Sequence, residues 1–261
     1  MRIRNILKRI AFVLAFAVVI VAVCLLARSN AKHFETMVVN QTQQHLLTIA
    51  KTQAKNVEDV VSGIQAELQI LAENPAIQQA IISNDSTDNV SAKSDYSLED
   101  GIFERLSRLS VQVSGLYRLD AYGIVQNRIP FKKDRIGVDF SHKPGVGTVM
   151  KSHKPYISEM FKANSGQYGI SICYPVFDDR TFIGIVRTAI YLNTITDMLN
   201  RIKIGQKGYA WIIDDDEITV VHPKPKYIGK DTIATRKEAF PDNDWSELEN
   251  IVARMTGGEE G

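Results

Sequence analysis

Residues 168–192 read YGISICYPVFDDRTFIGIVRTAIYL, and this stretch has the composition of a β-hairpin. Two runs rich in apolar, aromatic and β-branched residues, 168–176 and 182–192, flank the polar turn 177–180. Such runs on either side of a short turn predict two antiparallel strands that pair with each other. We therefore expect an antiparallel sheet in this part of the chain.

The segments around this hairpin predict further strands and helices. The shorter strands are expected in pairs around turns: 116–120 with 124–125, and 209–213 with 218–221. Residues 99–113 and 193–202 have the pattern of amphipathic helices, and the polar stretch 83–95 is expected to be a loop. Short antiparallel strands with helices on one side predict an α+β fold.

A faint internal repeat divides the predicted strands into two sets. In the first set, Asp120 precedes a turn and a strand and is followed by Ile-Gly-Val-Asp at 136–139. In the second set, Asp214 precedes a turn and a strand and is followed by Ile-Gly-Lys-Asp at 228–231. Two copies of one sheet unit, placed in tandem, explain this pattern better than one large sheet.

A long helix is predicted before the first sheet. Between Asn30 and Glu73 there is no proline, and Asn74-Pro75 ends the helical pattern because proline disfavours a helical residue before it. Apolar residues recur at spacings of three and four along one face: Leu47, Ala50, Ala54, Val57, Val61, Ile64, Leu68 and Leu71. This stripe either packs on the chain's own domain or forms a seam with a second copy, and we expect a homodimer.

An uncharged apolar run, residues 10–27, predicts one transmembrane helix near the N-terminus. Eighteen residues rise about 27 Å as a helix, enough to cross the hydrocarbon core of a bilayer. Four basic residues precede the run, so the N-terminus is expected in the cytoplasm and the rest of the chain outside it. A cleaved signal peptide is the alternative, with 29–31 as a weak cleavage site.

The composition argues against several classes of function. Thirty-one basic residues balance 30 acidic ones, so nothing favours nucleic acid as a partner. Cys24 lies in the apolar run and Cys173 in a predicted strand, so a structural disulfide between them is not expected. The usual motifs of catalytic, zinc and phosphate-binding sites are missing, and we expect neither an enzyme nor a cofactor.

Several short motifs, taken in order, resemble the double Cache sensor domains of prokaryotic transmembrane receptors. The motifs are LDAYG at 119–123, KPYIS at 154–158, YPVF at 174–177, FIGIV at 182–186, GQKGYAWIID at 205–214, VHP at 221–223 and IGK at 228–230. The resemblance implies tandem PAS-like sheets carried on one long helix. It divides the chain into a cytoplasmic tail (1–9), a transmembrane helix (10–28), a long extracytoplasmic helix (29–74), a complete membrane-distal unit (75–202) and an incomplete membrane-proximal unit (203–261).

The resemblance also implies a role in signalling. Such domains bind a small molecule outside the cell membrane and control a cytoplasmic histidine kinase, diguanylate cyclase or chemoreceptor module. Family members continue past the region of Gly229 into a second spanning helix, so the resemblance implies a truncated receptor. In the amino-acid-binding branch an Arg-x-Arg-Pro-Trp-Tyr stretch and an aspartate hold the ligand. Here residues 141–146 (SHKPGV) and Ala189 stand in those places, which disfavours an amino acid as the ligand.

In such sensors the pocket lies between the distal sheet and the segment that crosses it, here about 136–158. Arginine pairs well with carboxylates, so a small organic anion is the expected ligand. The candidate ligand-binding residues are polar or cationic: Arg118, Arg135, His142, Tyr156, Ser158, Tyr174 and Arg187. Each of them could instead belong to a solvated surface. No metal site is expected from His142 and His153, and the acidic run 214–216 is interpreted as a turn.

The sequence thus predicts an extracytoplasmic small-molecule sensing domain of a membrane-anchored receptor. The expected partners are a small-molecule ligand, the lipid bilayer and a second copy of the chain. A membrane-tethered exported enzyme and a dimerising scaffold protein without a ligand are the alternatives. His222-Pro223 is expected to border a second pocket in the proximal unit.

Overall fold

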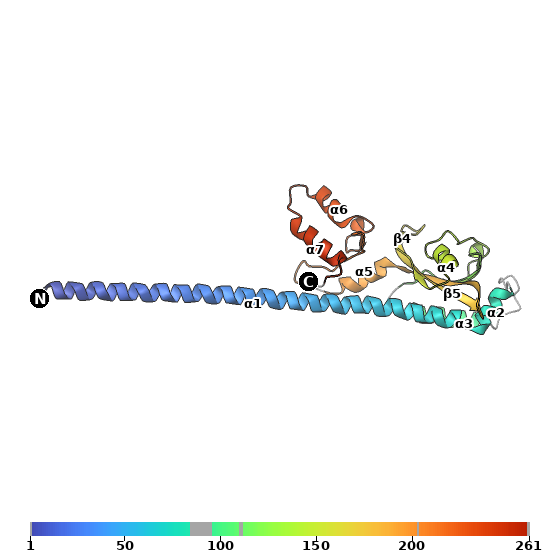
Figure 1. Ribbon diagram of the computed structural model, residues 1–261, viewed down its shortest axis with the longest axis horizontal. Coiled ribbons are helices and arrows are strands. Elements are labelled where there is room, and N and C mark those ends of the chain that lie inside the picture. Colours follow the sequence, from blue (N-terminus) through green and yellow to red (C-terminus); the bar gives the residue numbers. More distant parts are fainter. Residues whose placement is uncertain (1, 84–95, 110–111, 203, 260–261) are drawn as a thin grey trace. The chain divides into compact units, whose positions relative to one another are not determined.

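A computed structural model describes the chain over residues 2–83, 96–109, 112–202 and 204–259 (Figure 1). For residues 2–24, 96 and 97 it describes the backbone alone. The chain divides into two units, the helical stretch Met1–Thr52 and the compact unit Gln53–Gly261. The sheet and the candidate site belong to the second unit.

The described helices include one very long element and several short ones. They are α1 (Arg2–Ala72), α2 (Pro75–Ile82), α3 (Tyr96–Ser107), α4 (Val146–Ser152), α5 (Leu192–Asn200), α6 (Thr232–Ala239) and α7 (Ser246–Thr256), with 3-10 turns η1 (Lys133–Arg135) and η2 (Pro225–Tyr227). The described strands are β1 (Leu116–Asp120), β2 (Val125–Ile129), β3 (Tyr156–Ile157), β4 (Phe161–Lys162), β5 (Tyr168–Asp178), β6 (Thr181–Tyr191), β7 (Ile212–Ile213) and β8 (Thr219–Val221).

The main sheet is antiparallel and is built around the hairpin of β5 and β6. Its strand order is β2-β1-β6-β5-β3, and β4 pairs with the start of β5. The predicted hairpin is confirmed, with its tight turn between Asp178 and Thr181. The predicted α+β class with an antiparallel sheet and a long N-terminal helix is confirmed as well.

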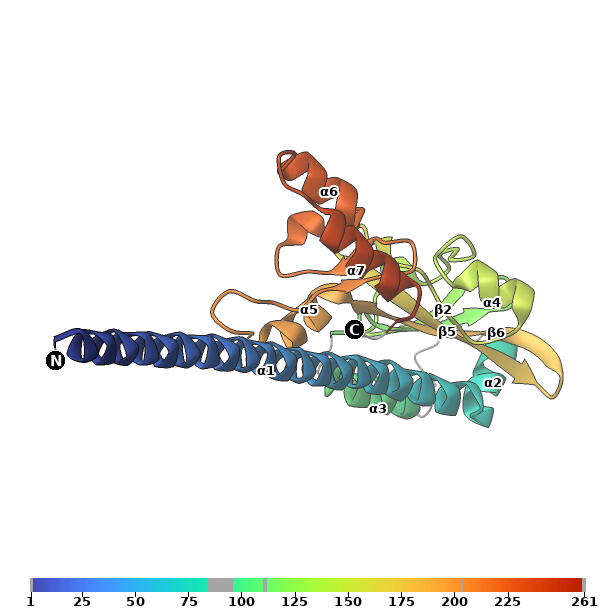
Figure 2. The ribbon, with the colours of Figure 1, turned by 60° about the vertical axis from the view of Figure 1, so that its left-hand side comes forward.

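The end of α1 covers one face of this sheet together with α2 and α3 (Figures 1 and 2). Ile64, Leu68 and Leu71 are fully buried and belong to one core with Val186 and Ile190 of β6. The last part of the predicted stripe therefore packs on its own domain, because spacings of four and three place these side chains on one helical face. Ile64 is accordingly not available for a seam with a second copy.

The chain leaves α1 through a short cap and begins α2 at once. Asn74 accepts a hydrogen bond from the backbone N–H of Ala76 through Oδ1, at 2.9 Å. Pro75 occupies the first turn of α2, where its missing N–H costs nothing. The predicted end of the long helix at Asn74-Pro75 is thus correct to within two residues.

The opposite face of the sheet is covered by α4 and the segment before it. Val146 and Val149 of α4 are fully buried against Cys173 of β5 and Ile185 of β6. Figure 2 shows α4 on the side of the sheet opposite to α1 and α3. The prediction that all helices lie on one side was therefore wrong, because the crossing segment contains a helix of its own.

The internal repeat seen in the sequence reappears as repeated hydrogen bonding. Asp120 and Asp214 each accept, through Oδ1, the backbone N–H of the residue four positions later, at 2.9 and 2.8 Å. Gly137 and Gly229 have φ values of +77° and +76°, a conformation that favours glycine. Each donates its N–H at 2.8 Å to the carbonyl oxygen of the first residue of the preceding strand, Val125 of β2 or Thr219 of β8.

Several predictions concern regions where the structure differs or is silent. Within residues 204–259 the paired strands are β7 and β8, so the strand predicted at 209–213 is shortened to two residues. Most of the loop predicted at 83–95 lies outside the described residues. No helix among the fully described residues is long and apolar enough to cross a membrane. The predicted span 10–28 falls mostly on residues described by backbone alone and stays a prediction.

Candidate ligand-binding site

One row of side chains crosses the main sheet on the face that carries α4. The register pairs Arg128 with Tyr117, Tyr117 with Arg187, Arg187 with Cys173, and Cys173 with Tyr156. Residues that lie directly opposite each other on neighbouring strands project to the same face. Five strands thus contribute to one continuous floor, with two arginines and two tyrosines in it.

Arg187 is the central cation of this row and is 5% exposed. Its Nε donates a hydrogen bond to Ser171 Oγ at 2.7 Å. Its guanidinium carbon lies 5.7 Å from the ring centroid of Tyr117 and 5.6 Å from that of Phe140. Within the described residues, no carboxylate lies within ion-pair distance of Arg187. A buried charge without an opposite charge is costly, so this position is suited to an anion.

Arg128, the second arginine of the row, is held by hydrogen bonds to fixed oxygen atoms. Its Nε donates to the Tyr117 hydroxyl at 3.0 Å, its Nη2 to the carbonyl of Ser114 at 3.1 Å, and its Nη1 to the carbonyl of Pro130. Its guanidinium also lies 5.4 Å from the Tyr117 ring centroid. Arg128 therefore positions Tyr117, while Arg187 has no carboxylate within ion-pair distance among the described residues.

Gly145, at the start of α4, lies close against the sheet. Its φ is +85°, and a Cβ atom at this position would lie 2.9 Å from Cys173 Sγ. The same Cβ atom would lie 3.7 Å from Ser158 Cβ and 3.8 Å from Ser171 Cβ. Only a residue without a side chain allows this approach without strain.

A hollow of about 490 Å³ lies beside this segment. Gly145 contributes to its lining, which also includes three basic side chains: His142, Lys143 and Lys151. None of the described residues that line it is acidic. Arg187 is not among the described residues that line this hollow. Gly145, which lines it, lies close to Ser171, whose Oγ accepts the hydrogen bond from Arg187 Nε.

Cys173 lies beneath Gly145 and is fully buried. Burial raises the pKa of its thiol, and the nearby Arg187 charge opposes that rise only in part. Its Sγ lies 3.5 Å from Ser171 Oγ. The thiolate is the nucleophilic form of cysteine, so a raised pKa makes Cys173 a poor nucleophile.

The structure brings three further predicted residues to this region. Tyr156 is half-buried against the same cluster as Cys173, and His142 is an exposed residue of the hollow. Ser158 is buried, and its Oγ accepts the backbone N–H of Ser171 at 2.9 Å. Arg135 is not part of the row, because it lies in η1 with its Nε 3.5 Å from Asp134 Oδ2.

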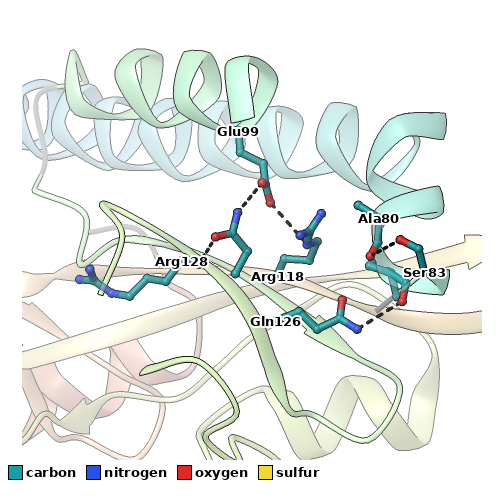
Figure 3. Close-up of polar contacts among 8 residues, drawn as sticks. Ala80, Ser83, Glu99, Arg118, Gln126 and Arg128 are labelled. Carbon is teal, nitrogen blue, oxygen red and sulfur yellow. Dashed lines mark hydrogen bonds and ion pairs between the residues drawn. The ribbon is translucent and has the colours of Figure 1, made fainter. Parts of the chain in front are cut away.

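Arg118 and Tyr174, by contrast, lie on the helix-covered face, so they do not share a face with Arg187, and their predicted role in ligand binding stays a prediction. The register pairs both with Val186, one position away from Arg187, and alternate residues of a strand project to opposite faces. Arg118 instead lies beside Glu99 of α3, with its Nε 3.8 Å from Glu99 Oε1 (Figure 3). Tyr174 packs against the core that contains Leu68 and Leu71 of α1, and burial there, together with the charge of Glu73, raises the pKa of its hydroxyl.

Glu99, Arg118 and Asn127 form a buried polar cluster that joins α3 to the sheet. Glu99 and Arg118 are 3% and 4% exposed, and Asn127 Nδ2 donates to the other carboxylate oxygen of Glu99 (Figure 3). Neighbouring Gln126 donates to the carbonyl of Ile81 at 3.2 Å, which ties the end of α2 to the same strand. The cluster therefore stabilises the fold and is separate from the candidate site.

Sequence reasoning missed Tyr117, Phe140, Ser171 and Gly145. Strict alternation along 116–120 would have placed Tyr117 and Arg118 on opposite faces, but it could not tell which face binds a ligand. His153 was considered for metal binding, and its ring instead stacks on Phe182 with centroids 4.5 Å apart. Among the described residues no group of His, Cys, Asp and Glu could hold a metal ion.

Solved structures with this fold include extracellular ligand-binding domains. The ligand-binding domain of the Pseudomonas fluorescens chemoreceptor CtaA in complex with L-isoleucine is 21% identical, with a TM-score of 0.58. The alignment covers 80% of this chain and 78% of that domain. The ligand-binding domain of the Pseudomonas aeruginosa PAO1 amino acid chemoreceptor PctC, in complex with GABA, is 20% identical, with a TM-score of 0.57 and coverages of 77% and 83%.

A third structure is an extracellular ligand-binding receptor from Desulfohalobium retbaense, 20% identical with a TM-score of 0.54. The alignment covers 72% of this chain and 33% of that receptor, so this chain spans about a third of its length. At these identities the likeness shows a shared fold. The family model of the Cache domain matches residues 33–259, and the chain therefore belongs to the Cache domain family.

Proposed function

We propose that this chain is the extracytoplasmic small-molecule sensing domain of a membrane-anchored signalling receptor. The family membership and the shared fold with chemoreceptor ligand-binding domains support a sensing role. The observation that carries the proposal is Arg187, a buried guanidinium with no carboxylate within ion-pair distance in the described part of the chain. A receptor of this kind converts ligand binding into a shift between conformations.

The proposed ligand is a small organic anion that Arg187 binds through its carboxylate. Arginine donates parallel hydrogen bonds to a carboxylate, which fixes both the position and the orientation of a ligand. CtaA and PctC were solved with amino acids, whose ammonium group needs an acceptor. Ala189 lies on the Arg187 face, and no acidic residue lines the hollow beside Gly145. These features favour an anion without an ammonium group.

We also infer that the bound ligand leaves chemically unchanged. Among the described residues of the site, Cys173 is the only cysteine. Burial raises the pKa of its thiol, which disfavours the nucleophilic thiolate. The hydroxyl of Ser158 donates to the backbone carbonyl of Glu159 and accepts from Ser171, so it has no adjacent base. Both observations argue against an exported enzyme.

The proposed topology places residues 10–28 in the membrane and the sheet outside the cytoplasm, as the charge pattern predicts.

We infer that residues 203–261 begin a second, membrane-proximal PAS-like unit. The repeated bonding of Asp120 and Asp214 supports this inference, as do the matching glycines Gly137 and Gly229.

We further propose that the protein forms a homodimer through α1, N-terminal to its buried end. Large apolar side chains on the helical stretch Met1–Thr52 are exposed, among them Phe34, Met37, Val38 and Leu46. Parallel helices in a two-stranded seam would cover such residues, and a second copy of the chain supplies an identical helix.

The proposed function can be tested by calorimetric titration of the full chain with small carboxylates, amines and amino acids. We expect saturable binding of a carboxylate without turnover. Arg187→Ala should weaken that binding about tenfold or more, because a hydrogen bond to a charged group contributes roughly 1.5–3 kcal/mol. Arg187→Lys should retain part of the affinity.

Arg180→Ala is the matched control, since Arg180 is an exposed arginine in the turn of the same hairpin. This variant should bind the carboxylate within twofold of the parent. Unchanged affinity of a folded Arg187→Ala variant would remove Arg187 from the site, and conversion of the ligand would favour the enzyme alternative.

A further inference from the structure

A second cavity, of about 730 Å³, lies away from the Arg187 site. Its walls come from the loop and strand around Tyr168, from α5, and from residues 222–230 beyond β8. It therefore lies between the main sheet and the segment that contains the second copy of the internal repeat. Its volume is within the usual range of small-molecule sites, about 300–1,000 Å³.

The lining of this cavity is electropositive. Lys162, Lys226 and Lys230 contribute to it, and Asp197 is the acidic residue among the described residues that line it. Two of the lysines are partly ordered by aromatic rings. Lys162 Nζ lies 5.6 Å from the Tyr168 ring centroid, and Lys226 Nζ lies 4.9 Å from that of Tyr227. Three ammonium groups around one cavity attract a small molecule with more than one negative charge.

His222 lines the same cavity, and its ring carries a buried donor. Its Nδ1 accepts the backbone N–H of Lys224 at 2.9 Å, so the proton of the neutral ring is on Nε2. Nε2 is buried and has no hydrogen-bond partner among the described residues. The ring is held in place by Tyr209 and Tyr227, with centroids 5.0 and 4.7 Å away. A buried donor without an acceptor is unfavourable, so an acceptor in the cavity would be stabilised.

We propose that this cavity is a second ligand site, which binds a small organic anion with two or more carboxylates. The lysines supply the charge, and His222 supplies an oriented neutral donor. An anion bound here would connect α5, which follows the main sheet directly, to residues 222–230. The site would therefore act on the junction between the two repeats, and it does not depend on the ligand of Arg187.

The test is titration of the full chain carrying Arg187→Ala with succinate, malate and citrate, followed by calorimetry. The Arg187→Ala background removes the charge of the first site. Binding to the second cavity can therefore be tested independently of the ligand proposed for Arg187. We expect saturable binding of at least one of the three acids. Adding Lys226→Ala and Lys230→Ala should weaken this binding tenfold or more.

The matched control adds Lys132→Ala and Lys133→Ala instead, because these exposed lysines are remote from the cavity lining and removing them changes the net charge equally. This control should bind within twofold of its parent. Equal losses in the two double-lysine variants would show a nonspecific charge effect and overturn the proposal. Absence of saturable binding by all three acids, with the fold intact by circular dichroism, would also overturn it.

Discussion

The close approach of Gly145 to Cys173 allows the cost of replacing this glycine to be predicted, as a change in the free energy of unfolding. In Gly145→Ala the new Cβ atom would lie 2.9 Å from Cys173 Sγ, 0.5 Å inside the 3.4 Å limit of ordinary contact. Overpacking of this kind costs roughly 1–3 kcal/mol. The φ of +85° adds backbone strain of about 1–3 kcal/mol for a residue with a side chain. We therefore expect a loss of roughly 2–6 kcal/mol in the free energy of unfolding.

The two contributions can be separated by urea unfolding of matched variants, followed by circular dichroism. Gly166 has nearly the same φ, +84°, but nothing lies within 4 Å of its Cβ position, so Gly166→Ala reports the backbone strain alone. In a Cys173→Ala background the steric part should vanish, and Gly145→Ala should cost at least about 1 kcal/mol less than in the parent. An equal cost in the two backgrounds would refute the contact, and so would a Gly145→Ala cost no greater than that of Gly166→Ala.

Three further outcomes are expected. Glu99→Ala should lower the free energy of unfolding by roughly 3–5 kcal/mol, because it removes the carboxylate beside the buried Arg118; a urea midpoint close to the parent's would contradict this. Burial, and then the charge of Arg236, lower the pKa of His222 to about 4 from 6.5. Between pH 6.5 and 4 His222 is protonated in the unfolded chain but neutral in the folded one. Stability that is present above pH 6.5 is therefore lost as the pH falls towards 4, by up to about 3 kcal/mol. His222→Phe should flatten this part of the stability curve, and an unchanged slope would assign it to other groups. Finally, the variant Val38→Cys, made in the full chain in membranes with Cys24 replaced by serine, should form disulfide-linked dimers. If oxidation gave only monomers, the α1 seam would be rejected.

Much of the fold could be predicted because its signals are local. The two β-type runs around residues 177–180 became β5 and β6. The stripe that ends at Leu71 packs on the sheet, and the repeat around Asp120 and Asp214 reappears as matching hydrogen bonds. Each of these features depends on residues within a few positions of one another, where periodicity and turn chemistry are informative.

The candidate site could be predicted only in part because it depends on strand register. Arg187 was identified as a cation on a strand, but its neighbour Tyr117 is 70 positions earlier in the chain. Arg118 was grouped with Arg187 because both are arginines in strands, although a one-residue difference in register puts them on opposite faces. The partner of Arg118, Glu99, comes from a helix, and no pattern in one sequence indicates that pairing.

The main sheet has two buried arginines, Arg128 and Arg187, on the face that carries α4 and one, Arg118, on the other face, and in the described part of the chain a carboxylate accompanies only Arg118. Positive charge is therefore left uncompensated on the face that carries α4, and ordinary laboratory anions would compensate it. Protein purified in citrate or phosphate would melt later than the same protein in chloride, and a screen run in such a buffer would score the natural effector as inactive. The choice of counter-ion during purification is accordingly part of any binding experiment on this protein.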